Sequence, residues 1–241
     1  MLGLPPQSAR MAHKIFLHQS FQQVAPGLWQ LEGSLPFPLK RNMTVVKLSS
    51  GGLLIYSAIA LDAAGFTELE KLGNPEIIVV PQPFHVMDLA FYKQKYPQLK
   101  VLGPKQGEEF NGVRVEADVV AVLKDANVTA SLAPGLKNPE VHLKIQVPGG
   151  YALCVCDIFA GENCYAQGIG ASIFKWMLGT SNDGFGIAKI VKWRQIADRA
   201  AVKNWVLGLA SDQQLKMVLV CHGESFKGDM AAAMQQAAAV L

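Results

Sequence analysis

The chain has 241 residues, of which 50% are hydrophobic, enough apolar material for one large domain or two small ones. Its formal net charge is only +3, and its lysines and arginines are scattered, so the basic stripe typical of nucleic-acid-binding proteins is missing. The 4 cysteines lack the dense spacing of a disulfide scaffold. We therefore expect no nucleic-acid partner, and reduced thiols in a cytoplasmic protein.

Residues 1–20 mix prolines with polar residues and are expected to form an extended lead-in, followed by a single domain over residues 21–241. Pro5 and Pro6 interrupt the apolar run near the start, so we expect no signal peptide. The most membrane-like window, residues 169–179, contains a lysine and is far shorter than the roughly 20 apolar residues that span a bilayer. We predict a packed helix there and no membrane partner.

The first half of the chain reads as alternating strands and helices. Apolar or β-branched runs bounded by glycine predict strands over residues 27–33 and 43–59, with a hairpin turn at residues 50–52. Residues 62–75 have apolar residues at helical spacing and a glycine stop, which predicts a helix. A strand, a helix carrying Leu89, Tyr92 and Tyr96, and a further strand are predicted from residue 76 to residue 104.

The centre of the chain lacks a helical period. Strands are predicted there over residues 113–123, 127–133, 141–147 and 151–156. A helix over residues 193–212, a strand over residues 216–221 and an alanine-rich terminal helix follow. Because strands and helices alternate near both ends while strands dominate the centre, we predict an α/β layered domain with antiparallel sheet.

Polar residues directly follow three of the predicted strands. His85 and Asp88 come after "IIVV", Asp157 after "YALCVC", and His222 after "MVLVC". Strand ends are where loops meet in layered folds, so these groups can converge. Imidazole and carboxylate are ligands of zinc and iron, and they also donate and accept protons. Taken singly, each position also fits a structural histidine or an aspartate that caps a turn.

The order of these segments resembles the metallo-β-lactamase superfamily, whose fold is an αββα sandwich of two mixed, largely antiparallel sheets flanked by helices. Members typically bind two metals through an HxHxDH segment, a further histidine, a bridging aspartate and a final histidine. The resemblance places Asp88 on the aspartate of that segment, Asp157 on the bridging aspartate and His222 on the final histidine.

The chain departs from this pattern at the other ligand positions. Ser57 stands where the early strand often ends in aspartate, and His85 lies between two of the expected histidine positions. Apolar residues occupy those histidine positions, namely Phe84, Val86, Leu89 and Leu136. The resemblance therefore implies that hydrocarbon lines the former metal pocket, which makes an incompletely coordinated divalent cation costly there.

A closer resemblance is to the little-characterised DUF4336 family. It is carried by "CDIFAGEN", "WRQIADRAAVKNWV", "VLVCHGE" and two longer stretches that begin with "LWQLEG" and "VVPQPFHVMD". Together these cover most of residues 27–225, through order and spacing rather than through one unique motif.

Three hypotheses for function follow. A dinuclear site needs about six or more donors, so the three matched donors predict that it has been lost, leaving a protein without a metal cofactor that binds a small molecule or partner at the old active-site edge. Alternatively, His85 turns inward and joins Asp157 and His222 in a single zinc or iron site. The protein would then hydrolyse an ester, thioester, lactam or phosphodiester, with Asp88 as a catalytic proton acceptor. The third is a metal-free enzyme that uses Asp157 and His222, or a cysteine.

Two further features bear on the site. Cys156 and Cys221 each precede a candidate ligand, and because side chains alternate along a strand, we expect both to point into the core. Residues 159–191 follow the strand that delivers Asp157 and are rich in aromatic residues and glycine. They are placed to form a mobile lid over the pocket, an ordinary helix and loop, or a homodimer contact.

Overall fold

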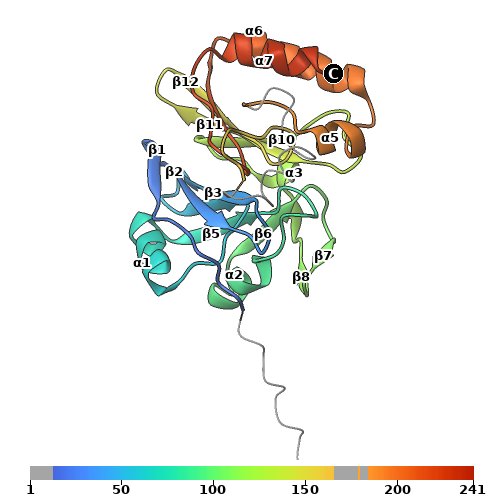
Figure 1. Cartoon of the computed structure of the whole chain (residues 1–241). Helices are drawn as coiled ribbons and strands as arrows, with labels where there is room; N and C mark the ends of the chain where they lie inside the picture. Colours follow the sequence, from blue (N-terminus) through green and yellow to red (C-terminus); the bar gives the residue numbers. More distant parts are fainter. Residues whose placement is uncertain (1–12, 166–178, 180–183) are drawn as a thin grey trace, which may run out of the picture.

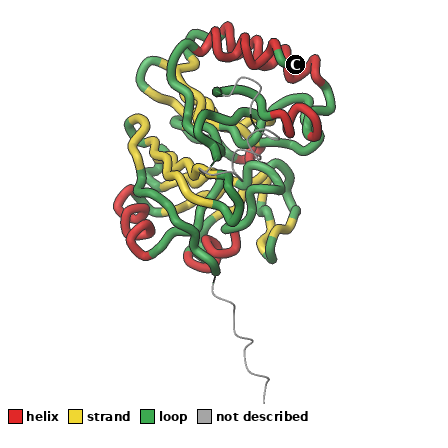
Figure 2. Tube along the Cα trace, in the orientation of Figure 1, coloured by secondary structure: helices red, strands yellow, loops and turns green. Residues whose placement is uncertain are grey.

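The structure is a computed structural model, and it describes residues 13–165, 179 and 184–241. Two β-sheets face each other, and helices cover the outer face of each sheet, so that the layers follow the order helix, sheet, sheet, helix (Figures 1 and 2). This is the predicted αββα sandwich. No helix in the described part of the chain is long and apolar enough to span a membrane.

The larger sheet has seven strands in the order β1-β2-β3-β4-β5-β6-β9. Neighbours pair antiparallel from β1 to β4 and parallel from β4 to β9. The predicted hairpin joins β3 to β4, and Gly51 takes a positive φ of 91° in its turn. The strands are β1 (Gln22–Ala25), β2 (Leu28–Ser34), β3 (Lys40–Lys47), β4 (Leu53–Tyr56), β5 (Pro75–Val79), β6 (Lys100–Gly103) and β9 (Ala117–Asp118).

The smaller sheet has four strands in the order β10-β11-β12-β13. Its strands are β10 (Val128–Leu132), β11 (Val141–Val147), β12 (Gly150–Cys154) and β13 (Leu215–Leu219). The pair β12–β13 is parallel and the other two pairs are antiparallel, so the segments that follow β12 and β13 leave the sheet at the same edge. A two-stranded ribbon of β7 (Glu109–Phe110) and β8 (Val113–Arg114) completes the strands of the described residues.

The helices cover opposite outer faces of the sandwich (Figure 1). Helices α1 (Ala63–Leu72) and α2 (Leu89–Lys95) lie on the larger sheet, and α6 (Arg199–Ser211) and α7 (Met230–Ala239) lie on the smaller one. Aspartates whose carboxylates accept a hydrogen bond from a first-turn amide begin α1, α6 and α7, as expected for N-caps.

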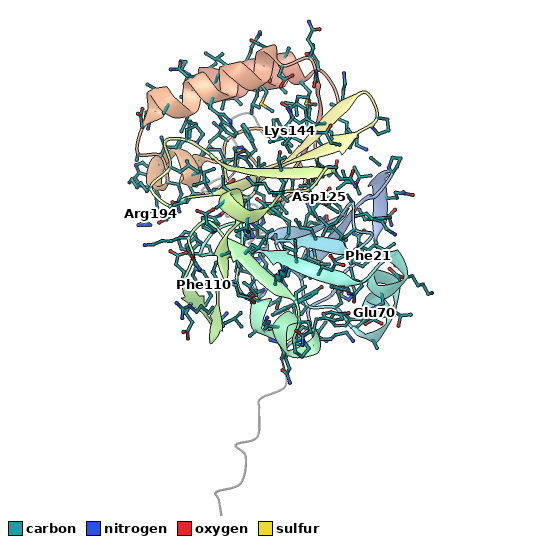
Figure 3. The ribbon with its side chains drawn as sticks, turned by 180° about the vertical axis from the view of Figure 1, so that it is seen from behind. Phe21, Glu70, Phe110, Asp125, Lys144 and Arg194 are labelled. Carbon is teal, nitrogen blue, oxygen red and sulfur yellow. The ribbon has the colours of Figure 1, made fainter. Side chains whose placement is uncertain are left out.

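Three layers of buried apolar side chains hold these elements together. Side chains fill the space between the sheets and the helices (Figure 3). Side chains alternate along β4, so Leu53 and Ile55 face α1 and α2 while Leu54 and Tyr56 face the other sheet. The third layer lies between the smaller sheet and its helices, where Met234 is fully buried. Each buried Leu or Met side chain contributes about 1.5–3 kcal/mol. The strand ends between the layers are therefore held by packing on both faces of each sheet.

Two predicted elements are wrong in detail. The predicted strand over residues 113–123 is two short strands in different sheets, β8 and β9, followed by a short helix, α3 (Val119–Val122). Asp118 begins this helix because its side chain accepts hydrogen bonds from the amides of Val120 and Ala121. The predicted helix over residues 193–212 is two helices. Helix α5 (Lys189–Arg194) ends before α6 because the amides of Ala197 and Asp198 both donate to Gly135 O instead of continuing the helix.

The described part of the predicted lead-in contacts the larger sheet. Ser34 donates its amide to Leu17 O, and Gln19 donates to Glu32 O, so these residues run along β2. The domain boundary at residue 21 stays a prediction.

Candidate functional site

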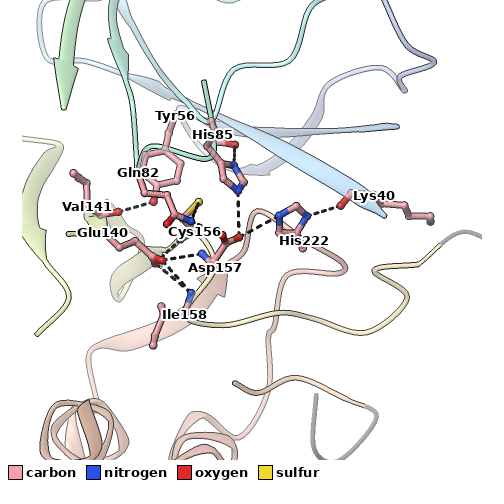
Figure 4. A network of polar contacts seen from close by, with 11 residues as sticks. Lys40, Tyr56, Gln82, His85, Glu140, Val141, Cys156, Asp157, Ile158 and His222 are labelled. Atoms are coloured by element: carbon pink, nitrogen blue, oxygen red, sulfur yellow. Dashed lines mark hydrogen bonds and ion pairs between the residues drawn. The ribbon is translucent and has the colours of Figure 1, made fainter. Parts of the chain in front are cut away.

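Three segments that follow strands of both sheets meet at one edge of the sandwich (Figure 4). Cys154 of β12 lies opposite Leu219 of β13 in the parallel register, and Asp157 and His222 each lie three residues beyond this pair. The loop after β5, from the larger sheet, brings His85 against them. The topology thus delivers one carboxylate and two imidazoles to the same place.

A glycine makes the turn after His222 possible. Gly223 has a φ of 83°, and a Cβ atom added there would lie 2.5 Å from Glu162 O and 2.7 Å from Gly161 O. Any other residue would be strained in this conformation and would collide with that backbone. Asn42 also holds the turn, because its Nδ2 donates to Val220 O at 2.9 Å and to Gly223 O at 2.6 Å.

The three predicted metal ligands are brought together. Oδ1 of Asp157 lies 3.2 Å from Nε2 of His85 and 3.2 Å from Nε2 of His222. The two imidazole rings are edge to face with centroids 5.2 Å apart. Both rings therefore direct Nε2 toward the same carboxylate oxygen, and His85 faces inward, as the single-site hypothesis requires.

Each candidate ligand is oriented by a hydrogen bond to a neighbouring group. Nδ1 of His222 lies 2.6 Å from Lys40 O and donates to this carbonyl, so Nε2 is the nitrogen that faces Asp157. Nδ1 of His85 lies 2.9 Å from Oγ of Ser57. Nε2 of Gln82 donates to Oδ2 of Asp157. Ser57 stands at the position where the early strand of the family often ends in aspartate, whereas no sequence motif indicates Gln82, a single polar residue between two prolines.

Charges inside the site perturb both partners of the His85–Asp157 pair. Burial alone would lower the pKa of His85, but the charge of Asp157 and its hydrogen bond outweigh burial and raise the pKa to about 10. Burial alone would raise the pKa of Asp157, but the charge of His85 and hydrogen bonds from both imidazoles hold it well below its usual range. Asp157 is therefore ionised at neutral pH and attracts a positive charge.

Glu140 anchors the loop that carries Asp157, and sequence reasoning missed it. Its side chain accepts hydrogen bonds from the backbone amides of Cys156 at 2.9 Å, Asp157 at 3.0 Å and Ile158 at 3.1 Å (Figure 4). Burial and the nearby charge of Asp157 raise the pKa of Glu140 to about 8, although the amide hydrogen bonds oppose this. The only available signal was a glutamate just before an apolar strand.

Asp88 lies in a different contact network. Its side chain is fully buried, with Oδ2 2.5 Å from Nη2 of Arg41 and Oδ1 2.6 Å from Nε2 of His13. The amide of Ala60 also donates to Oδ2, at 3.0 Å. These contacts tie Asp88 to β3 and to the lead-in, and its role as a catalytic residue stays a prediction.

A cavity of about 180 Å³ lies against the site, and Asp157 and His222 form part of its lining. Its other walls are mainly apolar and include Leu39, Ala160, Ala188, Ile190 and Val191. Asp157 and His222 are therefore accessible from a small, largely hydrocarbon space, while His85 lies behind them.

The apolar residues at the family's histidine positions do not line this cavity, contrary to expectation. Phe84 is 63% exposed, Leu89 packs under the larger sheet, Val86 packs against that same cluster, and Leu136 packs against the helices of the smaller sheet. The loop after β5 consists of turns and bends over residues 82–88, so its side chains do not alternate toward the cavity as they would along a strand.

The predicted lid falls largely outside the described residues, at 166–178 and 180–183. Its two described ends meet, because Ala160 and Gly186 exchange backbone hydrogen bonds and the rings of Phe159 and Phe185 lie 5.2 Å apart. Residues from both ends line the cavity. Whether the segment moves stays a prediction.

The donor set fits a single divalent cation. Two ligand atoms on a tetrahedral zinc ion with bonds of 2.0–2.1 Å are about 3.3 Å apart. The two nitrogen-to-oxygen distances of 3.2 Å match this separation, and all three donor atoms lie within 4.8 Å of one another. Two imidazoles and one carboxylate suit zinc or iron, and the cavity beside Asp157 and His222 leaves room for a further ligand.

Solved structures with the same fold are metallo-β-lactamases. The DIM-1 metallo-β-lactamase is 11% identical to this chain with a TM-score of 0.60, over 93% of this chain and 99% of that one. FIM-1 from Pseudomonas aeruginosa, in a mono-zinc form, is 12% identical with a TM-score of 0.56, over 95% and 98% of the two chains. The enzyme from Hirschia baltica is 10% identical with a TM-score of 0.57, over 93% and 98%. No family model and no curated protein matches the chain. At these identities the likeness shows the metallo-β-lactamase fold alone.

Proposed function

We propose that this protein binds one zinc or iron ion through His85, Asp157 and His222 and hydrolyses an ester, thioester, lactam or phosphodiester bond. The observation that carries the proposal is the convergence of three donor atoms within 4.8 Å at the wall of a cavity. The fold of metallo-β-lactamases and the mono-zinc form of FIM-1 support it, since a single zinc ion is held in at least one protein of this fold. Membership of the DUF4336 family and a cytoplasmic location stay predictions.

The residues around such a site would have different roles in hydrolysis. The ion, when bound, would polarise the carbonyl or phosphoryl oxygen of the substrate and activate a water molecule. Lys40 O fixes the tautomer of His222, and Gln82 and the Glu140-anchored loop fix the carboxylate of Asp157. The apolar cavity walls would bind the hydrocarbon part of a small substrate and exclude bulk water.

A site for one ion, rather than two, agrees with the side chains available. Beyond the three ligands, Asp88 is already paired with Arg41 and His13. Phe84, Val86, Leu89 and Leu136 offer no donor atom at the remaining family positions. This supports the loss of the second metal position while the first donor set is kept.

Elemental analysis of protein purified without chelator tests the proposal. We expect about one equivalent of zinc or iron, lost in His222→Ala and Asp157→Asn and kept in the control His142→Phe, which changes a histidine outside the site. Turnover of an ester or phosphodiester should follow the metal content. Protein that is metal-free as purified, and that takes up no zinc, iron or manganese in an equilibrium titration, would refute it.

A metal-free binding protein is the second candidate, and one observation favours it. Both oxygens of Asp157 already accept hydrogen bonds, Oδ1 from the two imidazoles and Oδ2 from Gln82. The carboxylate is therefore satisfied without a cation, and the cavity could hold a small apolar molecule. A ligand that raises the melting temperature of the chelator-treated protein, with no metal bound, would favour this function.

A further inference from the structure

Two cysteines lie side by side directly behind the candidate metal ligands. Cys156 and Cys221 are each two residues beyond the parallel pair of Cys154 and Leu219, and they are 0% and 2% exposed. Both belong to the apolar layer between the sheets, as the alternation of strand side chains predicts. Their thiols are close enough to hydrogen-bond to each other.

His85 contacts both this thiol pair and the candidate metal site formed with Asp157 and His222. Cys221 lies within hydrogen-bonding reach of both His85 and Ser57, and Ser57 contacts Nδ1 of the His85 ring. Nε2 of the same ring points the other way, toward Asp157. One donor atom each from His85, Cys156 and Cys221 lie within 4.8 Å of one another. The imidazole of His85 therefore belongs to both groups of candidate ligands.

The other buried thiol of this layer has a different environment. Cys154, 1% exposed and two residues earlier on β12, hydrogen-bonds to Oγ1 of Thr44. It is as buried as Cys156 and Cys221, but among the described residues it does not belong to a cluster of candidate metal ligands. A buried cysteine without other ligands nearby, such as Cys154, behaves as an ordinary core residue. Cys156 and Cys221 differ from it because the imidazole of His85 lies beside them.

We propose that Cys156, Cys221 and His85 form a second cation site that selects thiophilic ions such as zinc or copper(I). Around a tetrahedral zinc with Zn–S bonds of about 2.3 Å and a Zn–N bond of about 2.0–2.1 Å, the ligand atoms are about 3.5–3.8 Å apart, which the 4.8 Å cluster accommodates with small movements. The thiols and the imidazole release to solvent the protons that they still carry as they bind the ion, so a divalent ion with two thiolates and a neutral imidazole gives a neutral centre. Soft sulfur ligands disfavour magnesium, calcium and manganese.

The thiol site lies deeper in the molecule than the wall of the cavity. The side chain of Asp157 is 24% exposed and that of His222 is 13% exposed, while His85 stands behind them at 9%. The thiol site does not depend on hydrolysis, nor on His222 as a ligand.

Cobalt(II) titration of the metal-free, reduced, full-length protein distinguishes the two sites. A thiolate ligand produces a near-ultraviolet sulfur-to-cobalt charge-transfer band, whereas nitrogen and oxygen ligands produce only weak visible bands. We expect the charge-transfer band in the wild-type protein, a loss of at least half of its intensity in Cys156→Ser and Cys221→Ser, and no change in the matched control Cys154→Ser.

Histidine variants separate this proposal from the proposed function. His222→Ala should keep the charge-transfer band while losing any hydrolysis, and His85→Ala should weaken both. Alanine variants of the two cysteines, with circular dichroism to confirm folding, replace the serine variants if a buried hydroxyl proves too costly. Cobalt binding without the band, a band that both cysteine variants leave unchanged, or no cobalt binding at all would each overturn the thiol site.

Discussion

Replacing Glu140 tests whether the loop that carries Asp157 is held by a single side chain. Glu140→Ala leaves the buried amides of Cys156, Asp157 and Ile158 without an acceptor. Each buried unsatisfied amide costs about 1–3 kcal/mol, so the three together lose about 3–9 kcal/mol. Removing the buried carboxyl group returns part of this, because burying a polar group costs free energy. We expect a net loss of about 3–5 kcal/mol in the free energy of unfolding.

Urea unfolding measures this loss directly, provided that the m-value stays unchanged. Glu140→Gln keeps one acceptor oxygen and should lose only about 1–2 kcal/mol. Glu116→Ala is the matched control, since Glu116 is exposed at 46% of its side chain and also accepts from a backbone amide, that of Val101. Its loss should stay below about 1 kcal/mol. Equal losses in the Glu140→Ala and Glu116→Ala variants would refute the anchoring role.

Two further changes have effects that follow from particular contacts. Burial lowers the pKa of His142 to about 4, so the unfolded chain takes up a proton between pH 6.5 and 4 that the folded protein cannot, and stability falls as the pH falls. His142→Phe keeps an aromatic ring stacked on Trp205. It should remove about 2–3 kcal/mol of the difference in unfolding free energy between pH 7 and pH 4.5, measured by urea unfolding. If this difference is unchanged in the variant, His142 is not its source. Gly223→Ala should destabilise the protein by more than about 2 kcal/mol and lower its metal content. The reason is that the new methyl group would collide with the backbone of residues 161 and 162. A melting temperature equal to that of the wild type would show that the turn tolerates the methyl group.

The fold could be predicted from the sequence because packing follows periodicity. The strands of β3, β4, β5 and β11 are apolar runs with turn residues at their ends, and their alternation decides which core each side chain enters. Prediction failed where a local polar contact overrides the pattern. Asp118 turns an apolar run into α3, and Gly135 O captures two amides that a continuous helix would have used. The first contact is a local N-cap that the apolar pattern of the run conceals. The second joins residues far apart in the chain, and no local pattern contains it.

The candidate site shows the same difference between regular strands, which can be predicted, and irregular loops, which cannot. Asp157 and His222 follow regular strands in a parallel pair, so their meeting could be predicted from their order alone. His85 could not be placed in this way, because it lies in an irregular loop where neither a period of two nor one of 3.6 sets the direction of a side chain.

That loop is fixed from both ends by contacts to other parts of the fold. Gln82 donates to Asp157 at one end, and Asp88 pairs with the buried Arg41 at the other. His85 lies between these anchors, and Ser57 holds its ring from behind. Asp88 therefore contributes to the site by position whether or not it takes part in chemistry. Arg41→Ala should then displace His85 and weaken both donor sets, seen as a weaker charge-transfer band in the cobalt titration, although no hydrogen bond or ion pair among the described residues joins Arg41 to Asp157 or to either cysteine.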